Sequence, residues 1–205
     1  GFRLAAAWGE DDFWDVALWM ANTWGDFKVV FNIGYLEDTE GNGLGSSFTL
    51  VTAAGGGSFC CGGANFQEIK GSAGIMHVPT GLFVDGAYVH REFDDTLGNG
   101  LVSPREDFDF WYVKAGIEGK WTPLGRTTLF GQYGHSESWN LTHAANLAGG
   151  SQDLDHWGAG INQEISAAAM DLYLVYKHFE ADVVTSGVAV NLDDIGAVVA
   201  HIRGR

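Results

Sequence analysis

The chain has little cysteine, little proline and little positive charge, and it has no long hydrophobic run. Of its 205 residues, two are Cys and three are Pro, and 11 Lys and Arg stand against 26 Asp and Glu, for a net charge of -15. A surface that binds DNA or RNA neutralises phosphates with clustered Lys and Arg, so this balance argues against nucleic acid as a partner. No stretch approaches the roughly 18 uninterrupted apolar residues that a transmembrane helix needs, so a helical membrane protein is not expected.

The two cysteines are adjacent, at Cys60 and Cys61, inside a glycine-rich run. They offer neither a zinc-ligand spacing nor a disulfide framework, so we interpret them as two loop thiols or one vicinal disulfide and not as a redox centre. The chain opens on Gly1 to Leu4, which already alternate like a strand, and not on a signal-peptide pattern. We therefore expect a start that is mature, processed or truncated.

What the chain does have is glycine and aromatic residues, with 30 Gly, 13% aromatics and eight Trp. This mixture serves a helical bundle poorly and is found in many β-barrels. The apolar residues also alternate with a period of two, which is the period of a β-strand. The clearest case has its large apolar side chains on one face: Phe27, Val29, Phe31, Ile33 and Tyr35.

The same alternation recurs twice further along the chain. One parity of residues 110–121 carries Trp111, Val113, Ala115, Ile117 and Trp121, and one parity of residues 170–178 carries Met170, Leu172, Leu174 and Tyr176. The opposite parity is largely polar. We predict about ten strands, at residues 2–9, 13–21, 25–36, 67–78, 81–92, 107–120, 126–136, 154–165, 168–179 and 193–203.

The predicted connections are in turn short and long. Short links are expected near Asn22-Thr23, at Pro79-Thr80, at 122–125 and at Ser166-Ala167, and longer ones at 37–66, 93–106, 137–153 and 180–192. The link at 10–12 is an exception, because it is short where a long loop is due. Short turns on one rim and long loops on the other are typical of outer-membrane barrels, and strands of about 9 to 11 tilted residues cross the hydrocarbon core. The fold class predicted is all-β, a transmembrane antiparallel up-and-down β-barrel, in preference to a soluble β-sandwich or lipocalin-like barrel.

Several phrases of the sequence resemble the porins of alphaproteobacteria, and together they run through nearly the whole chain. They lie at residues 14–18, 25–29, 76–84, 110–118, 123–125 and 168–174. The resemblance implies a passive diffusion channel in the bacterial outer membrane, formed by trimers of barrels with about sixteen strands. The chain looks like the C-terminal portion of such a barrel, so residues 1–205 are either one barrel domain or part of one. Family members usually end on an aromatic residue, whereas this chain ends at Arg205.

If the apolar parity faces lipid, the opposite parity lines the lumen. We predict these pore-lining residues: Lys28, Asp85, Arg91, Lys114, Glu118, Lys120, Arg126, Asp171 and Lys177. Fixed charges beside a narrow aqueous path select among ions and solutes. The tryptophans are expected to form interfacial girdles next to lipid and lipopolysaccharide, with Trp19 the exception because its parity faces inward.

No feature of the sequence predicts an enzyme, a metal site or a cofactor. The serines form no Gly-x-Ser-x-Gly elbow, and the seven histidines include no His-x-x-x-His pair and no neighbouring cysteine cluster. The competing function is a narrow or plugged structural barrel that anchors the envelope or binds a partner. A closed barrel of only about ten strands is narrow enough for its own side chains to fill, whereas sixteen or more leave an aqueous channel.

Overall fold

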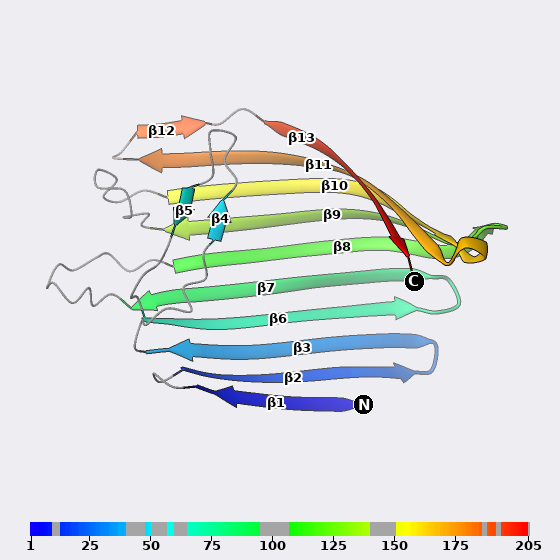
Figure 1. Cartoon of the computed structure of the whole chain (residues 1–205), viewed down its shortest axis with the longest axis horizontal. Helices are drawn as coiled ribbons and strands as arrows, with labels where there is room; N and C mark the ends of the chain where they lie inside the picture. Colours follow the sequence, from blue (N-terminus) through cyan, green and yellow to red (C-terminus); the bar gives the residue numbers. More distant parts are fainter. Residues whose placement is uncertain are drawn as a thin grey trace, which may run out of the picture.

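The chain forms one long sheet of antiparallel strands, shown in Figure 1 as a computed structural model. The structure describes residues 1–9, 13–39, 48–50, 57–59, 65–94, 107–139, 151–185, 188–191 and 194–204. The long strands are β1 (Phe2–Trp8), β2 (Phe13–Trp24), β3 (Phe27–Asp38), β6 (Asn65–His77), β7 (Leu82–Asp94), β8 (Asp107–Thr122), β9 (Gly125–Trp139), β10 (Ser151–Ile165), β11 (Met170–Thr185) and β13 (Ile195–Gly204). The short strands are β4 (Phe48–Leu50), β5 (Gly57–Phe59) and β12 (Val188–Asn191).

Each long strand pairs with the next one along the chain, so the topology is up-and-down. The main sheet has eleven strands, in the order β1, β2, β3, β6, β7, β8, β9, β10, β11 and β12, with β13 also beside β11. β12 pairs with residues 182–185 of β11 and β13 pairs with residues 170–179, so both occupy the same side of β11. The sheet therefore has ten strand positions, which confirms the predicted number, and β1 and β13 do not pair with each other.

Tight turns join the strands at one end of the sheet, which we call the turn end, and the opposite end is the loop end. Both termini lie at the turn end (Figure 1). The turns predicted at Pro79-Thr80, 122–125 and Ser166-Ala167 are confirmed, the last as a 3₁₀ turn at Ser166–Ala168. The turn predicted near Asn22-Thr23 is wrong. These two residues are paired within the β2–β3 ladder, and the chain reverses at 25–26, where Gly25 adopts a left-handed φ of 58° that costs glycine little.

The strand boundaries agree with prediction to within three residues, except that β11 ends at Thr185, six residues later than predicted, and β4, β5 and β12 were not predicted. Two predictions concern residues outside the described ranges: the short link at 10–12 and the nature of Cys60 and Cys61. Among the residues that are described, no helix is long and apolar enough to cross a membrane.

The two faces of the sheet differ in chemistry. Because paired residues of adjacent strands point to the same side, the register divides the side chains into two sets. We call the face that carries Phe31 the apolar face, and the face that carries Lys28, Asp85, Lys114 and Val175 the polar face. Val175 is the most deeply buried large side chain and lies on the polar face, whereas the large side chains of the apolar face are widely exposed.

Candidate functional site

Aromatic side chains border the aliphatic band of the apolar face. At the loop end, Trp111 packs against Tyr133 with ring centroids 5.5 Å apart, and Trp157 packs against Tyr176 at 5.6 Å. At the turn end, the exposed Trp24 borders the aliphatic band. Between the girdles the exposed residues are aliphatic: Ile33, Ile69, Ile75, Val84, Val113, Leu129, Ile161 and Leu174. An exposed apolar band between aromatic girdles is what the outer membrane requires of a barrel.

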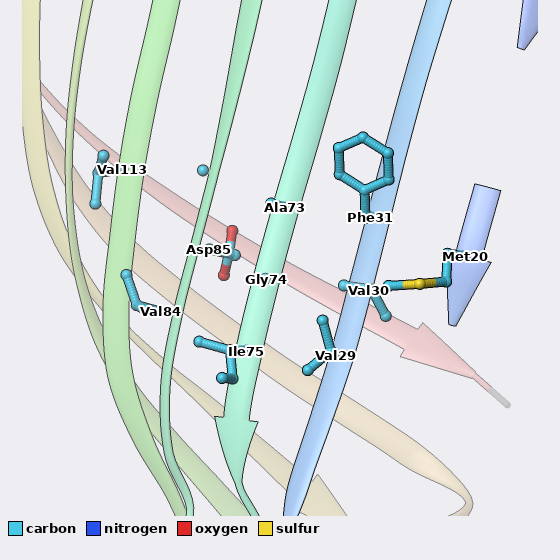
Figure 2. A pocket seen from close by; sticks show the side chains of 11 residues that line it. Met20, Val29, Val30, Phe31, Ala73, Gly74, Ile75, Val84, Asp85 and Val113 are labelled. Carbon is cyan, nitrogen blue, oxygen red and sulfur yellow. The ribbon is translucent and has the colours of Figure 1, made fainter. Parts of the chain in front are cut away.

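A shallow hollow of about 450 Å³ lies on the sheet between β2 and β8 (Figure 2). Most of its lining belongs to the apolar face, including Met20, Phe31, Ile75 and Val113. Such a lining offers almost no hydrogen bonds to a polar solute, so the hollow suits an apolar neighbour and we do not place solute transport there.

The polar face collects the basic side chains. Apart from Lys120, which lies in a bulge of β8 between Gly119 and Thr122, every Lys and Arg in the described ranges is on this face: Arg3, Lys28, Lys70, Arg91, Lys114, Arg126, Lys177 and Arg203. Of the predicted pore-lining set, all but Lys120 therefore share one face. The structure shows their common face. Their position in a pore stays a prediction.

Four of the predicted residues form two ion pairs with one another. Lys114 Nζ lies 3.2 Å from the Asp85 carboxylate on the adjacent strand β7. Arg126 lies 2.9 Å from Glu118 and 3.9 Å from Glu164, and it spans strands β8, β9 and β10. These side chains remain partly exposed, as groups beside water do.

The most buried ion pair of the polar face was not predicted. The carboxylate of Glu68 accepts hydrogen bonds from Arg91 and, at 2.8 Å, from Lys70 Nζ. Glu68 and Lys70 alternate with the exposed Ile69, so the period of two in β6 carried the signal that would have found them. In contrast, Lys28 and Lys177 form no ion pair with any described residue, and the structure does not bring them to this cluster.

Aromatic rings also crowd part of the polar face. Phe110 stacks on His156 with centroids 6.5 Å apart, and His156 lies 5.9 Å from Phe179. Nearby, Phe130 stacks on Tyr173 at 5.8 Å. Trp19 is on this face as predicted, with the Arg3 guanidinium 5.2 Å from its ring centroid. The polar face is therefore a mixed surface of ion pairs and flat rings.

The comparisons with known proteins agree on the fold. No protein-family model matches the sequence, and a search of curated proteins finds no significant match. Among solved structures, outer-membrane expressed OmpT of Vibrio cholerae is similar with a TM-score of 0.52 and 17% identity, over 98% of this chain and 61% of that one. A loop L8 deletion mutant of that protein gives 0.49 at 15% identity, over 98% and 62% of the two chains, and its in-vitro folded trimer form gives 0.47 at 15%, over 97% and 61%.

The chain thus has the fold of an outer-membrane β-barrel protein, and it spans about 61% of the length of the OmpT chain it resembles. The apolar band between its aromatic girdles also indicates a membrane barrel. Backbone N–H and C=O groups can cross lipid only when they are paired, and the antiparallel sheet pairs them. The predicted fold class and the predicted location in the outer membrane are both confirmed.

Proposed function

We propose that the protein is a porin, a passive water-filled channel through which small polar solutes and ions diffuse across the outer membrane. The observation that carries this proposal is the distribution of charge. All but one of the described Lys and Arg residues lie on the polar face, with acidic partners such as Asp85 and Glu118 beside them. Charges of this kind are costly to bury away from water, so the polar face favours a hydrated lumen over a dry core.

The size of the barrel decides whether that lumen conducts. Ten strand positions are described and the first and last do not pair, so the ladder leaves room for further strands. The coverage of 61% of the OmpT chain supports a larger barrel, and the resemblance to alphaproteobacterial porins implies about sixteen strands. A barrel of that size leaves an aqueous channel. Association into homotrimers belongs to the same proposal and rests on the family resemblance.

The competing function is an occluded structural barrel, and one observation favours it. The rings of Phe110 and Phe179 both lie against His156 on the polar face, and such a layer would narrow a small barrel. No chemical reaction is part of either proposal.

Single-channel conductance separates the two. The protein is purified in detergent from its native membrane and added to a planar lipid bilayer in moderate salt, with detergent alone as the control. We expect stepwise, ohmic conductance increases, and steps arriving in threes would support the trimer. Persistent silence from protein that shows a β-sheet circular dichroism spectrum would overturn the channel and leave the occluded barrel.

A further inference from the structure

A repeated pattern of tyrosine, histidine and carboxylate lies on the apolar face at the loop end. On β7, β9 and β11, alternate residues read Tyr, His and Glu, and on β8 and β10 they read Asp, Asp and Trp. We call the polar members of these segments the acid–histidine rim: His90, Glu92, Asp107, Asp109, His135, Glu137, Asp153, Asp155, His178 and Glu180. Since alternate residues of a strand share a face, each histidine stands beside a glutamate of its own strand, and His90 and His135 are also the register partners of Asp109 and Asp155.

The rim carries seven carboxylates against three histidines. The described Lys and Arg residues lie on the opposite face or, for Lys120, in a bulge near the turn end. The rim also stands just beyond the Tyr133 and Trp157 girdle, where the outer surface of a barrel meets lipid headgroups. Glu137 and Asp153 have no described lysine or arginine on their face, and carboxylates in that position favour a cation from solution.

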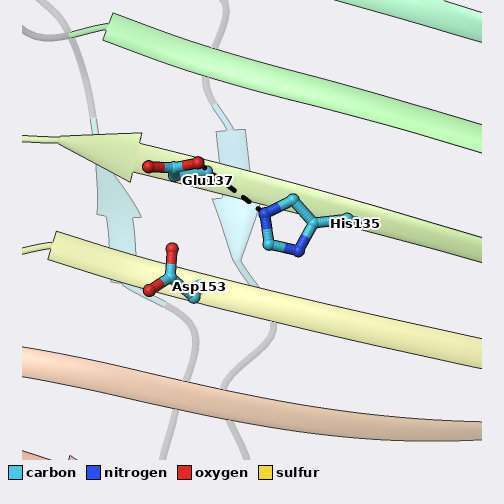
Figure 3. A group of neighbouring side chains, drawn as sticks. All are labelled: His135, Glu137 and Asp153. Atoms are coloured by element: carbon cyan, nitrogen blue, oxygen red, sulfur yellow. Dashed lines mark ion pairs between the residues drawn. The ribbon is translucent and has the colours of Figure 1, made fainter.

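One part of the rim has the geometry of a metal site. His135 and Glu137 alternate on β9, and Asp153 is the register partner of Glu137 on β10. One ligand atom from each of the three lies within 4.8 Å of the others, and all three side chains are half-buried. His135 Nε2 is 3.7 Å from a Glu137 oxygen, and Figure 3 shows Asp153 facing the same space.

A second carboxylate outside this trio orients the imidazole. His135 Nδ1 lies 3.0 Å from Asp155 Oδ1, which also accepts the Tyr133 hydroxyl hydrogen bond at 2.5 Å. An Nδ1–H that donates to Asp155 leaves the lone pair on Nε2, which faces Glu137. A metal-binding histidine almost always donates its other N–H to such a partner, so Asp155 supplies the feature that separates a histidine ligand from an ordinary surface pair.

We infer that His135, Glu137 and Asp153 bind a divalent transition-metal cation of the Zn²⁺ class and thereby clamp β9 to β10 at the outer rim. One imidazole nitrogen and two carboxylate oxygens suit Zn²⁺, whereas Ca²⁺ and Mg²⁺ prefer oxygen alone. Three protein ligands leave a further coordination position for water. The site does not depend on whether the lumen conducts.

A second group with the same three types of ligand lies one hairpin further on, with its two carboxylates more exposed. The ligand atoms of His178, Glu180 and Asp194 also lie within 4.8 Å of one another, with His178 Nε2 at 3.3 Å from Glu180 and 3.6 Å from Asp194. Because two groups of the same composition lie in consecutive hairpins, we expect the protein to bind a second equivalent of metal.

The test is metal retention by the purified protein and matched histidine variants. Each protein is stripped with EDTA, reloaded with ZnCl₂, passed through a desalting column and assayed by inductively coupled plasma mass spectrometry. The wild type is expected to retain two equivalents of Zn²⁺ per chain. His135→Gln and His178→Gln each lose one of them. His156→Gln, which removes a histidine from β10 on the polar face, retains both.

X-ray absorption at the zinc edge tests the ligands, and we expect an imidazole scattering shell in the wild type that weakens in His135→Gln. Equal retention by His135→Gln and His156→Gln would overturn the site, and so would a bound ion with oxygen ligands only. If His135→Gln fails to give a β-sheet circular dichroism spectrum, Glu137→Gln and Asp153→Asn take its place with the same expected loss.

Discussion

The substitution Glu68→Gln tests the ion pairing of the polar face most directly. The Glu68 side chain is 6% exposed and accepts a hydrogen bond from Arg91 Nε at 2.9 Å. The Arg91 guanidinium also lies 5.0 Å from the buried Phe66 ring centroid, so the pair sits in surroundings of low polarity. Glutamine keeps the volume of the side chain and removes its charge. We therefore expect a lower free energy of unfolding.

The magnitude follows from the burial of the two partners. Breaking a buried ion pair by removing one member costs about 3–5 kcal/mol. Because the glutamine amide oxygen can still accept a hydrogen bond, we expect Glu68→Gln to lie near the lower end of this range, at about 3 kcal/mol. The Lys70 partner is 51% exposed and adds less than about 1 kcal/mol. Glu118→Gln is the matched control, because its partner Arg126 is 56% exposed and the expected cost is below about 1 kcal/mol.

Urea unfolding in lipid vesicles, followed by tryptophan fluorescence, measures both costs. A double-mutant cycle with Arg91→Gln isolates the pair, and we expect the two single substitutions to be strongly non-additive. Additive effects, or a Glu68→Gln cost no larger than that of Glu118→Gln, would refute the view that Glu68 and Arg91 form a buried, coupled pair.

Three further sets of substitutions test the assignment of the two faces and one turn. In a KCl gradient, Asp85→Asn is expected to shift the ion permeability ratio towards anions and Lys114→Gln towards cations, each by roughly twofold. Glu137→Gln, on the apolar face, is the control and is expected to leave the reversal potential unchanged. Leu129→Lys, on the apolar face of β9, is expected to cost about 2–4 kcal/mol in vesicles, and an equal cost for Gln132→Lys on the polar face of β9 would contradict the orientation of the sheet. Gly81→Ala is expected to lower refolding yield far more than Gly25→Ala, because both glycines have positive φ but only at Gly81 would a Cβ lie 1.8 Å from the Glu118 carbonyl oxygen.

The sequence alone determined the strands and their faces. The period of two was strong enough in β3, β8 and β11 to predict both the strands and the side chains that share a face, because one side of each strand meets lipid and the other meets polar surroundings. The predicted pore-lining residues therefore fall on one face, with the exception of Lys120. The β2–β3 turn was misplaced because Asn22 and Thr23 are common turn residues, whereas the positive φ of Gly25 is what the reversal required.

The tertiary structure decided which residues meet across strands. His135 and Glu137 are two positions apart in sequence, but Asp153 joins them only through the register of β9 and β10. A helical His-x-x-x-His spacing does not describe this group, because residues that share a face of a strand are two positions apart. The third residue comes from the adjacent strand, and a single sequence does not reveal the register between two strands. The pairing of Glu68 with Arg91 is of the same kind. Local alternation fixed the face of each side chain, and only the hydrogen-bonded ladder fixed its partners.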